Sequence, residues 1–342
     1  MHMRFPSKEQ RLYLANILAD RWFFSRSIGA DPQSILVVKW DEIGDMATAT
    51  HVFALLRASY PSATITLLCK PFVRSLVEND PHIDRIITDI RAYDSVYHLV
   101  VELRGTWGTL LRSLWHKAKY RVGRAEIRLK HKGSQLHEID TNFEIIQPVL
   151  KPHVIPADPA LYYSEADAAR VNEFLETNNI KAFAIIHAGA RRKLRQWNHE
   201  RFALAAQYLH DRYGLQIIFA GSGEDAQDIA AIRSQLSFPA YDFTAGFSLS
   251  QFSCLCSRAS FYLGNESGPM HIASAFGTPL IGLFGPGVPY VFYPRSQRSA
   301  VLHIILSCNP CDQVHCVHPE NPCISRIQVS EVLVKIDEIL HK

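Results

Sequence analysis

Long hydrophobic runs, a strong net charge and a secretion-type leader are all missing from this sequence of 342 residues. A membrane-spanning helix needs about 20 successive apolar residues, so we expect none. Lys and Arg number 36 against 33 for Asp and Glu, which is too small an excess for a dedicated nucleic-acid binder. The segment 1–24 carries charges throughout and lacks the apolar core of a signal peptide. We therefore expect a cytoplasmic location. The small net charge still allows a local basic patch that binds an acidic substrate or a membrane surface.

The composition, 47% hydrophobic and 20% charged, is typical of a folded globular protein. Two regions show the same order of segments, in which a short run rich in β-branched residues is followed by a glycine-containing loop and a helical pattern. Near-continuous apolar strands that alternate with helices indicate parallel sheets covered on both faces. Strands are predicted at 34–40, 64–70, 85–89 and 98–103 in the first region, and at 182–187, 216–220, 261–264 and 280–284 in the second.

The same pattern predicts a two-domain α/β organisation. The first domain covers residues 1–155 and begins with a leading helix at 7–27, and the second covers 156–327. A segment with three prolines, Val149–Pro159, is expected to be the linker. A last helix within 328–342 is expected to pack back on the first domain. Two doubly wound domains that face each other would form a cleft at the carboxyl ends of both sheets, where ligands of such folds bind.

The first strand leads into the segment WDEIGDM, in which Asp45 falls in the first turn of the following helix. A carboxylate that faces the cleft could accept a proton from a hydroxyl nucleophile. The alternative is a helix N-terminal acid that only complements the macrodipole. Local pattern alone favours this second interpretation.

A basic loop opens the second domain with the segment HAGARRKLRQW. Gly189 and Ala190 are small enough to let backbone N–H groups approach an anion, and Arg195 is one of four cations that follow. Phosphate binding and a merely solvated loop are both compatible with this pattern.

The segment GNESGPMH ends a predicted strand and starts an Ala-rich helix. Ser267 is placed to cap that helix, whose first-turn N–H groups would face an anion. His271 lies one turn further on, and its position beside a candidate phosphate site favours a functional role over an ordinary helix position. Glu224, in the loop GSGED, is a candidate for holding a ribose hydroxyl, with simple helix initiation as the alternative.

Taken together, four segments resemble glycosyltransferase family 9, the lipopolysaccharide heptosyltransferases. They are ILVVKWDEIGDM, HAGARRKLRQWNHERFA, FAGSGEDAQ and YLGNESGPMHIASAFGTPLIGLFGP, and the likeness runs from about Ser34 to Leu340. The resemblance implies a GT-B fold, with two Rossmann-like domains across a cleft, and an inverting transferase that needs no metal for transfer. It also implies ADP-heptose as donor and the Kdo–heptose inner core of lipopolysaccharide as acceptor.

The resemblance assigns roles to particular residues. Asp45 takes the place of the proposed general base, and Arg195 that of a diphosphate-binding cation, where the family usually has Lys. Glu224 matches an acid near the ribose. The family's Asp-Ser/Thr-Gly-x-x-His pattern contributes the remaining donor-site candidates, with Glu in place of the usual Asp, and these are Glu266, Ser267, Gly268 and His271.

Arginines of the first domain are the candidates for binding a phosphorylated, carboxylate-rich acceptor, namely Arg104, Arg121 and Arg124. An acceptor anchored in lipid would bring the enzyme into peripheral contact with the inner membrane. Two alternatives to lipopolysaccharide transfer remain open. One is heptosyl transfer to a protein acceptor such as an autotransporter, and the other is a nucleotide-sugar-binding protein without transfer activity, against which the presence of Asp45 argues.

Four of the seven cysteines crowd into one C-terminal segment with the spacing C-x2-C-x4-C-x6-C. Such a cluster can hold a structural zinc or iron ion in a tetrahedral site of four sulfurs, and reduced, metal-free thiols are the alternative. The candidate ligands are Cys308, Cys311, Cys316 and Cys323.

Overall fold

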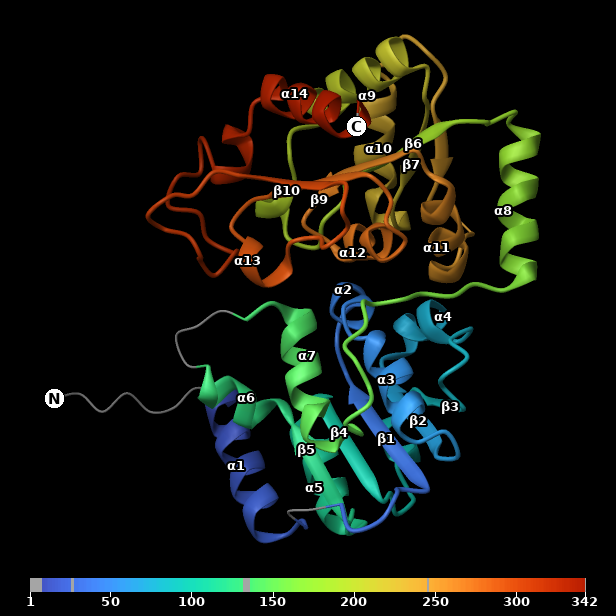
Figure 1. The fold of residues 1–342 in the computed structure, drawn as a ribbon. Coiled ribbons are helices and arrows are strands. Elements are labelled where there is room, and N and C mark those ends of the chain that lie inside the picture. The colour runs from blue at the N-terminus through green and yellow to red at the C-terminus, as the bar shows by residue number, and fades with distance from the viewer. Residues whose placement is uncertain (1–7, 26–27, 132–135, 245, 342) are drawn as a thin grey trace, which may run out of the picture. The chain divides into compact units, whose positions relative to one another are not determined.

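The computed structural model describes residues 8–25, 28–131, 136–244 and 246–341. The chain divides into two compact units, residues 1–160 and 161–342, close to the boundary predicted after residue 155. Each unit is a parallel β-sheet with helices packed around it (Figure 1). The predicted α/β class with two Rossmann-like units is therefore confirmed, and each unit is described by itself below.

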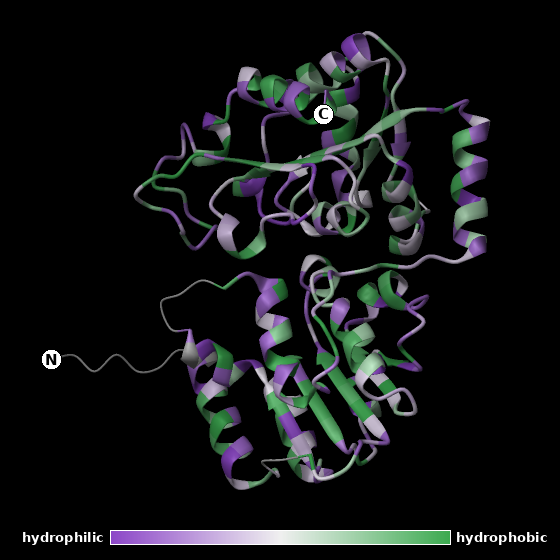
Figure 2. Ribbon diagram, viewed as in Figure 1, coloured by the Kyte–Doolittle hydropathy of each residue, from purple (hydrophilic) through white to green (hydrophobic). Residues whose placement is uncertain are grey.

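The sheet of the first unit has the strand order β3-β2-β1-β4-β5. Its central strands are buried, and their green colour in Figure 2 shows that they are largely apolar. The short strand β5 was not predicted, because its sequence YRVG contains an arginine where a buried strand normally carries an apolar residue. The strands are β1 (Ser34–Lys39), β2 (Thr64–Cys69), β3 (Arg85–Ile87), β4 (Leu99–Arg104) and β5 (Tyr120–Gly123).

Helices cover both faces of this sheet. The inner residues of α1 and α5 enter one core with Leu36, Val38 and Val100, while the alternate residues of β1 are buried on the opposite face. The predicted leading helix 7–27 is shorter in the structure, and residues 7, 26 and 27 lie outside the described part. The helices are α1 (Lys8–Trp22), α2 (Ile43–Ala47), α3 (His51–Ser59), α4 (Arg74–Val77), α5 (Trp107–Trp115), α6 (Arg124–Lys130) and α7 (Glu138–Ile146).

The sheet of the second unit has the order β11-β10-β9-β6-β7-β8, and all of its strands are parallel. The four predicted strands are present within a residue of their expected ends, and two edge strands, β8 and β11, were missed. The strands are β6 (Phe183–His187), β7 (Gln216–Ala220), β8 (Tyr241–Phe243), β9 (Phe261–Asn265), β10 (Leu280–Phe284) and β11 (Ser299–His303).

The last helix corrects one expectation. Val332, Ile336 and Ile339 of α14 are buried in the core of the second unit, beside α9. The helix therefore packs on the second unit and not on the first, because its apolar stripe completes the cover of the second sheet. The helices of this unit are α8 (Glu165–Thr177), α9 (His199–Tyr213), α10 (Ala226–Arg233), α11 (Leu249–Arg258), α12 (Gly268–Ala275), α13 (Pro289–Phe292) and α14 (Val329–Leu340).

Within the described residues, no helix combines the length and the apolar character that crossing a bilayer requires.

Candidate active site

Asp45 lies in the first turn of α2, directly after the carboxyl end of β1. Its side chain is partly buried. Burial raises the pKa of Asp45 to about 6, with Asp41 and Glu138 acting in the same direction and Lys39 and Arg104 opposing it. At neutral pH the carboxylate is therefore mostly ionised, and it is more basic than an ordinary aspartate. This is the protonation state that a general base needs.

A buried chain of opposite charges lies beneath Asp45. The Lys39 Nζ is 3.3 Å from Glu138 Oε1 and 3.5 Å from Asp41 Oδ2, and Lys39 has no exposed side-chain surface. Arg124 donates two hydrogen bonds of 2.7 Å to the two oxygens of Glu138. Burial alone would raise the pKa of Glu138, but Lys39 and Arg124 together lower it well below its usual range. These charges fix the electrostatic environment of the candidate base.

The sequence pattern did not indicate this network. Lys39 does give a signal in hindsight, because it follows four successive apolar residues of the strand, Ile35–Val38, and a buried lysine requires a partner. Its partner Glu138 begins α7, about 100 residues later, and nothing in the local sequence connects the two.

The three candidate acceptor arginines occupy different environments. Arg104 ends β4 and is exposed, with its Nε 3.7 Å from Asp41 Oδ2. Arg121 has no exposed side-chain surface and is bound by Asn16, Asp20 and Glu102. That burial corrects the expectation for Arg121, because a side chain fully enclosed by protein partners supports the fold and cannot touch an acceptor. Arg124 is also buried, but it lines a pocket.

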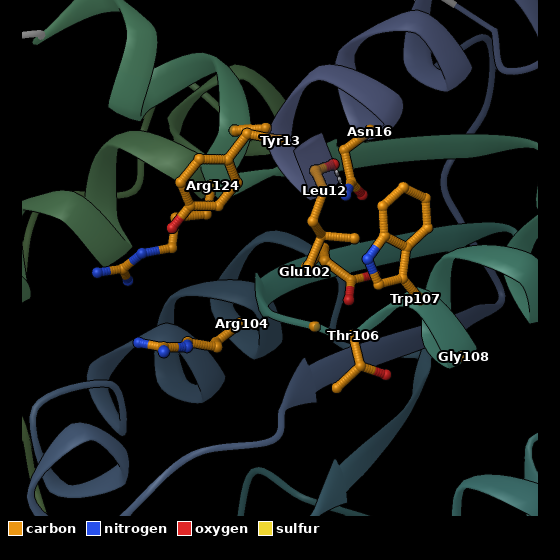
Figure 3. A pocket seen from close by; sticks show the side chains of 11 residues that line it. Leu12, Tyr13, Asn16, Glu102, Arg104, Thr106, Trp107, Gly108 and Arg124 are labelled. Carbon is orange, nitrogen blue, oxygen red and sulfur yellow. Dashed lines mark hydrogen bonds between the residues drawn. The ribbon is translucent and has the colours of Figure 1, made fainter. Parts of the chain in front are cut away.

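The pocket has a volume of about 500 Å³ and lies in the first unit, at the carboxyl end of β4. Figure 3 shows the guanidinium groups of Arg104 and Arg124 on one side of it and the Trp107 ring on the other. Tyr13 and Asn16, from the leading helix α1, complete its wall. Cationic groups opposite aromatic rings suit a saccharide that carries an anionic group, because sugar faces stack on aromatics while carboxylate or phosphate binds Arg.

In the second unit, Arg195 and Glu266 form an ion pair with 3.3 Å between Arg195 Nη1 and Glu266 Oε1. Arg195 ends a 3-10 turn, η4 (Lys193–Arg195), and its Nε also donates to Gln313 Oε1 at 2.7 Å. Glu266 is 4% exposed, and its Oε2 has no hydrogen-bond partner in the described part of the chain. Burial raises the pKa of Glu266 to about 7, against the opposing effect of Arg195. A buried carboxyl oxygen without a partner is ready to bind a hydroxyl group.

Gly287 lies against Glu266: a β-carbon at this position would lie 1.7 Å from Glu266 Oε2, so a larger residue would have to displace the carboxylate. The sequence offered no signal for this contact.

Ser267 occupies the N-cap position of α12 without making the expected side-chain cap. Its Oγ instead donates to Asn265 O at 3.1 Å and lies 3.3 Å from His187 Nδ1. The first-turn amides of α12, which begins at Gly268, are therefore left without that cap and carry the positive end of the helix dipole. His271 lies in the same helix, is buried and contacts the ring of Phe292.

The remaining donor-site candidates lie in two loops at the carboxyl ends of β6 and β7. Gly189 is buried and meets Asp225, whose Oδ1 would lie 2.2 Å from a β-carbon at Gly189. Ala190 is half-buried, and Glu224 is exposed in the 3-10 turn η5 (Gly223–Asp225). Asp225 was missed by the sequence pattern, although it accepts hydrogen bonds from the backbone N–H and the hydroxyl of Ser222. Asp225 therefore stabilises its own turn and lies against Gly189 of the neighbouring loop.

The four clustered cysteines line one small pocket, together with His315 and His318. Cys311 Sγ accepts a hydrogen bond from the Gln313 N–H, and Cys316 Sγ accepts one from the His318 N–H. Soft sulfur donors suit zinc or iron. Among the described residues, however, no three His, Cys, Asp or Glu side chains are grouped closely enough to hold a metal ion. The metal site therefore stays a prediction.

Known proteins resemble this chain along most of its length. A lipopolysaccharide heptosyltransferase 3 of Escherichia coli is 24% identical over 71% of this chain and 80% of its own. Two solved structures share the fold, and both are covered almost completely. They are a family 9 glycosyl transferase of Veillonella parvula (TM-score 0.81, 19% identity, 92% of this chain and 99% of that one) and the E. coli ADP-heptose lipopolysaccharide heptosyltransferase II (TM-score 0.72, 21% identity, 90% and 98%).

The profile of glycosyltransferase family 9 (heptosyltransferase) matches residues 112–321. This match includes the second-unit loops described above and the last part of the first unit. It covers more than half of the chain, and the predicted GT-B class agrees with the solved relatives. The chain belongs to glycosyltransferase family 9, the heptosyltransferases, and is a glycosyltransferase.

Proposed function

We propose that this enzyme transfers a heptose from ADP-heptose to an inner-core lipopolysaccharide acceptor, with inversion at the anomeric carbon. The observation that carries the proposal is the Arg195–Glu266 pair beside the uncapped N-terminus of α12. It combines a cation and backbone N–H groups for a diphosphate with a buried carboxyl oxygen for a sugar hydroxyl. The lipopolysaccharide heptosyltransferases among the relatives support the choice of sugar and acceptor.

On the acceptor side, Asp45 is the candidate general base. Its pKa of about 6 still lies below neutral pH, so Asp45 is mostly ionised there, and the raised value makes it a better proton acceptor than a solvated aspartate. The nearby pocket of Arg104, Arg124, Tyr13 and Trp107 is the candidate binding site for an anionic sugar of the acceptor. Arg104 is the residue that links them, since it lines this pocket and also lies against Asp41 in the network below Asp45.

The proposed mechanism follows from where charge moves. As an acceptor hydroxyl attacks the anomeric carbon, its proton passes to Asp45 and the C–O bond to the diphosphate breaks. Negative charge then builds on the leaving ADP, where Arg195 and the α12 amides stabilise it. Attack from the face opposite the diphosphate inverts the anomeric configuration. These residues suffice for the transfer without a metal ion.

The test follows ADP release and acceptor mass after incubation with ADP-heptose and a Kdo-containing lipid A acceptor. We expect a mass gain of one heptose with the wild type. Asp45→Asn keeps the size of the side chain but removes its basicity, so it should lower kcat by about 100-fold or more while ADP-heptose still binds. Asp94→Asn changes an exposed aspartate of the same unit and should have no effect.

Other outcomes separate the alternatives. Binding of ADP-heptose without any mass gain would move the search to protein acceptors, autotransporters included. Absence of turnover with every acceptor would favour a nucleotide-sugar-binding protein. If ADP-heptose does not bind, the assignment of the donor is wrong.

A further inference from the structure

The outer face of the leading helix α1 is unusually apolar. Leu14 and Leu18 are about half exposed, at 49% and 50%, and Trp22 is 76% exposed. These three residues follow a spacing of four and so lie on one side of the helix. The opposite side, with Ile17 and Ala19, is already buried in the unit. An ordinary surface helix has one apolar stripe and buries it, whereas α1 has a second one that faces outward.

Helix α5 repeats this feature. Trp107, Leu111 and Trp115 are spaced by four and are 40%, 62% and 83% exposed. Its buried side carries Thr109, Leu110 and Ser113. An almost fully exposed tryptophan is costly in water, because its large apolar surface remains hydrated.

The two outer faces point away from the same side of the same sheet. Ala19 of α1 and Leu110 of α5 enter one core with Leu36 and Val100, and the two helices contact each other. We call the exposed apolar residues of these two helices, with Phe23 just after α1, the α1–α5 face: Leu14, Leu18, Trp22, Phe23, Trp107, Leu111 and Trp115. Figure 2 shows hydrophobic green next to hydrophilic purple along α1.

On the two helices that form the α1–α5 face, the described exposed charges have one sign. Among the exposed side chains of residues 10–23 and 107–119, the charged ones are Arg11, Arg21, Lys117 and Lys119, and none is an acid. Asp20, the acid within this part of α1, is paired with the buried Arg121. Tryptophan and leucine surrounded by Arg and Lys is the composition of helices that lie in the headgroup region of a bilayer.

We propose that the α1–α5 face docks the enzyme on an anionic phospholipid membrane. The apolar side chains would enter the boundary between headgroups and acyl chains, while the four cations pair with lipid phosphates. Trp107 belongs both to this face and to the wall of the 500 Å³ pocket. A lipid-anchored acceptor could therefore reach the pocket without leaving the membrane; this last step alone depends on the proposed function.

The experiment is vesicle flotation of the purified full-length protein, with no substrate present. Vesicles of phosphatidylcholine containing phosphatidylglycerol are compared with vesicles of phosphatidylcholine alone, each at low and high salt. We expect binding to the anionic vesicles that weakens with salt, and a blue shift of tryptophan fluorescence on binding. Because no turnover is needed, failure of the proposed reaction would not affect this result.

The variants separate the apolar and charged contributions. Leu18→Asp should weaken binding by about tenfold or more, and Arg11→Glu combined with Arg21→Glu should weaken it by a similar factor. Leu204→Asp is the matched control, since Leu204 is a similarly exposed leucine, at 56%, on α9 of the second unit. It should bind like the wild type, and thermal melts verify that each variant is folded.

Two results would overturn the proposal. One is equal binding, or no binding, to anionic and neutral vesicles. The other is a self-association of the wild type, seen by sedimentation, that Leu18→Asp abolishes and Leu204→Asp does not. The face would then be an interface between copies of this chain.

Discussion

The two units use charge in different ways. In the second unit, Arg195 is partly exposed and bonded to Glu266 and Gln313, and each of these residues lies in a loop next to a strand end or in the cysteine segment. In the first unit, Lys39, Arg124 and Glu138 are buried and satisfy one another. Lys39, Arg124 and Glu138 of the first unit are therefore committed to the fold and set the environment of Asp45, whereas Arg195 of the second unit remains partly exposed, as its proposed role in binding the donor requires.

This difference means that removing the buried Arg124 of the first unit and removing Arg195 of the second should have different consequences. In the first unit it should affect folding before chemistry. In the second unit it should affect chemistry and leave folding intact.

The largest expected effect is on stability. Arg124→Met removes both hydrogen bonds that the buried Glu138 carboxylate receives from Arg124 and leaves Lys39 and the partly exposed Arg128 as its nearby cations, and breaking a buried ion pair typically costs about 3–5 kcal/mol of unfolding free energy. Urea unfolding measures this loss. Arg128→Met is the control, since Arg128 is 40% exposed and its Nη2 is 3.9 Å from Glu138, so we expect almost no change. Equal effects of the two would show that burial does not decide the contribution of these arginines.

Arg195→Ala should act on turnover. Loss of one group that stabilises a leaving-group charge costs about 100- to 1,000-fold in kcat, and urea unfolding should be unchanged because the side chain is partly exposed. Arg195→Lys should recover most of the activity, as the family usually has lysine there. Arg192→Ala, an exposed arginine of the same loop, should behave as the wild type. If Arg195→Ala instead lowered the free energy of unfolding, Arg195 would support the fold, as Arg124 does in the first unit.

The pH dependence of kcat/KM tests how the first-unit network sets the basicity of Asp45. With a pKa of about 6, Asp45 is protonated and inactive as a base below that pH, so kcat/KM should fall as the pH drops through 6. This fall is the acidic limb of the pH profile. Lys39 lowers the pKa of Asp45, so Lys39→Met should move the acidic limb to higher pH. Glu266→Gln removes the group with a pKa of about 7 in the second unit and should leave the limb in place. A limb that moves with Glu266→Gln instead would assign it to the donor site.

Sequence pattern predicted the second unit better than the first. The reason is the separation in sequence between the residues involved, which is short in the second unit and long in the first. Strands such as β7 and β10 are apolar runs bounded by glycine loops, and the loops that follow them carry polar residues at the sheet edge where ligands bind. Arg195, Glu266 and Ser267 became candidates because each lies in a segment that follows a strand end and resembles the family's motifs; their roles stay predictions.

Residues that act through distant partners were missed or misread. Arg121 was expected to bind an acceptor, yet Asn16, Asp20 and Glu102 enclose it, and two of these come from the leading helix about 100 residues earlier. Helix α14 was expected to pack on the first unit, because its apolar stripe shows that it is buried but not against which surface. Local periodicity fixes which face of an element is buried, and long-range pairing decides its partner.

The smallest expected effect concerns the cysteine segment. A hydrogen bond from Arg195 to Gln313 connects this segment to the proposed donor site. We propose that Cys308, Cys311, Cys316 and Cys323 bind about one zinc or iron ion per chain. Protein purified without chelator should contain that metal by elemental analysis, and Cys311→Ser should lose it. Transfer should fall only severalfold, because the metal would order the segment that holds Arg195 and take no part in the reaction. Cys254→Ser, a buried cysteine of α11 away from this segment, should retain the metal. Four thiols that react readily with a thiol reagent in a metal-free native protein would rule the site out and leave the Arg195–Gln313 hydrogen bond as the connection between the segment and the donor site.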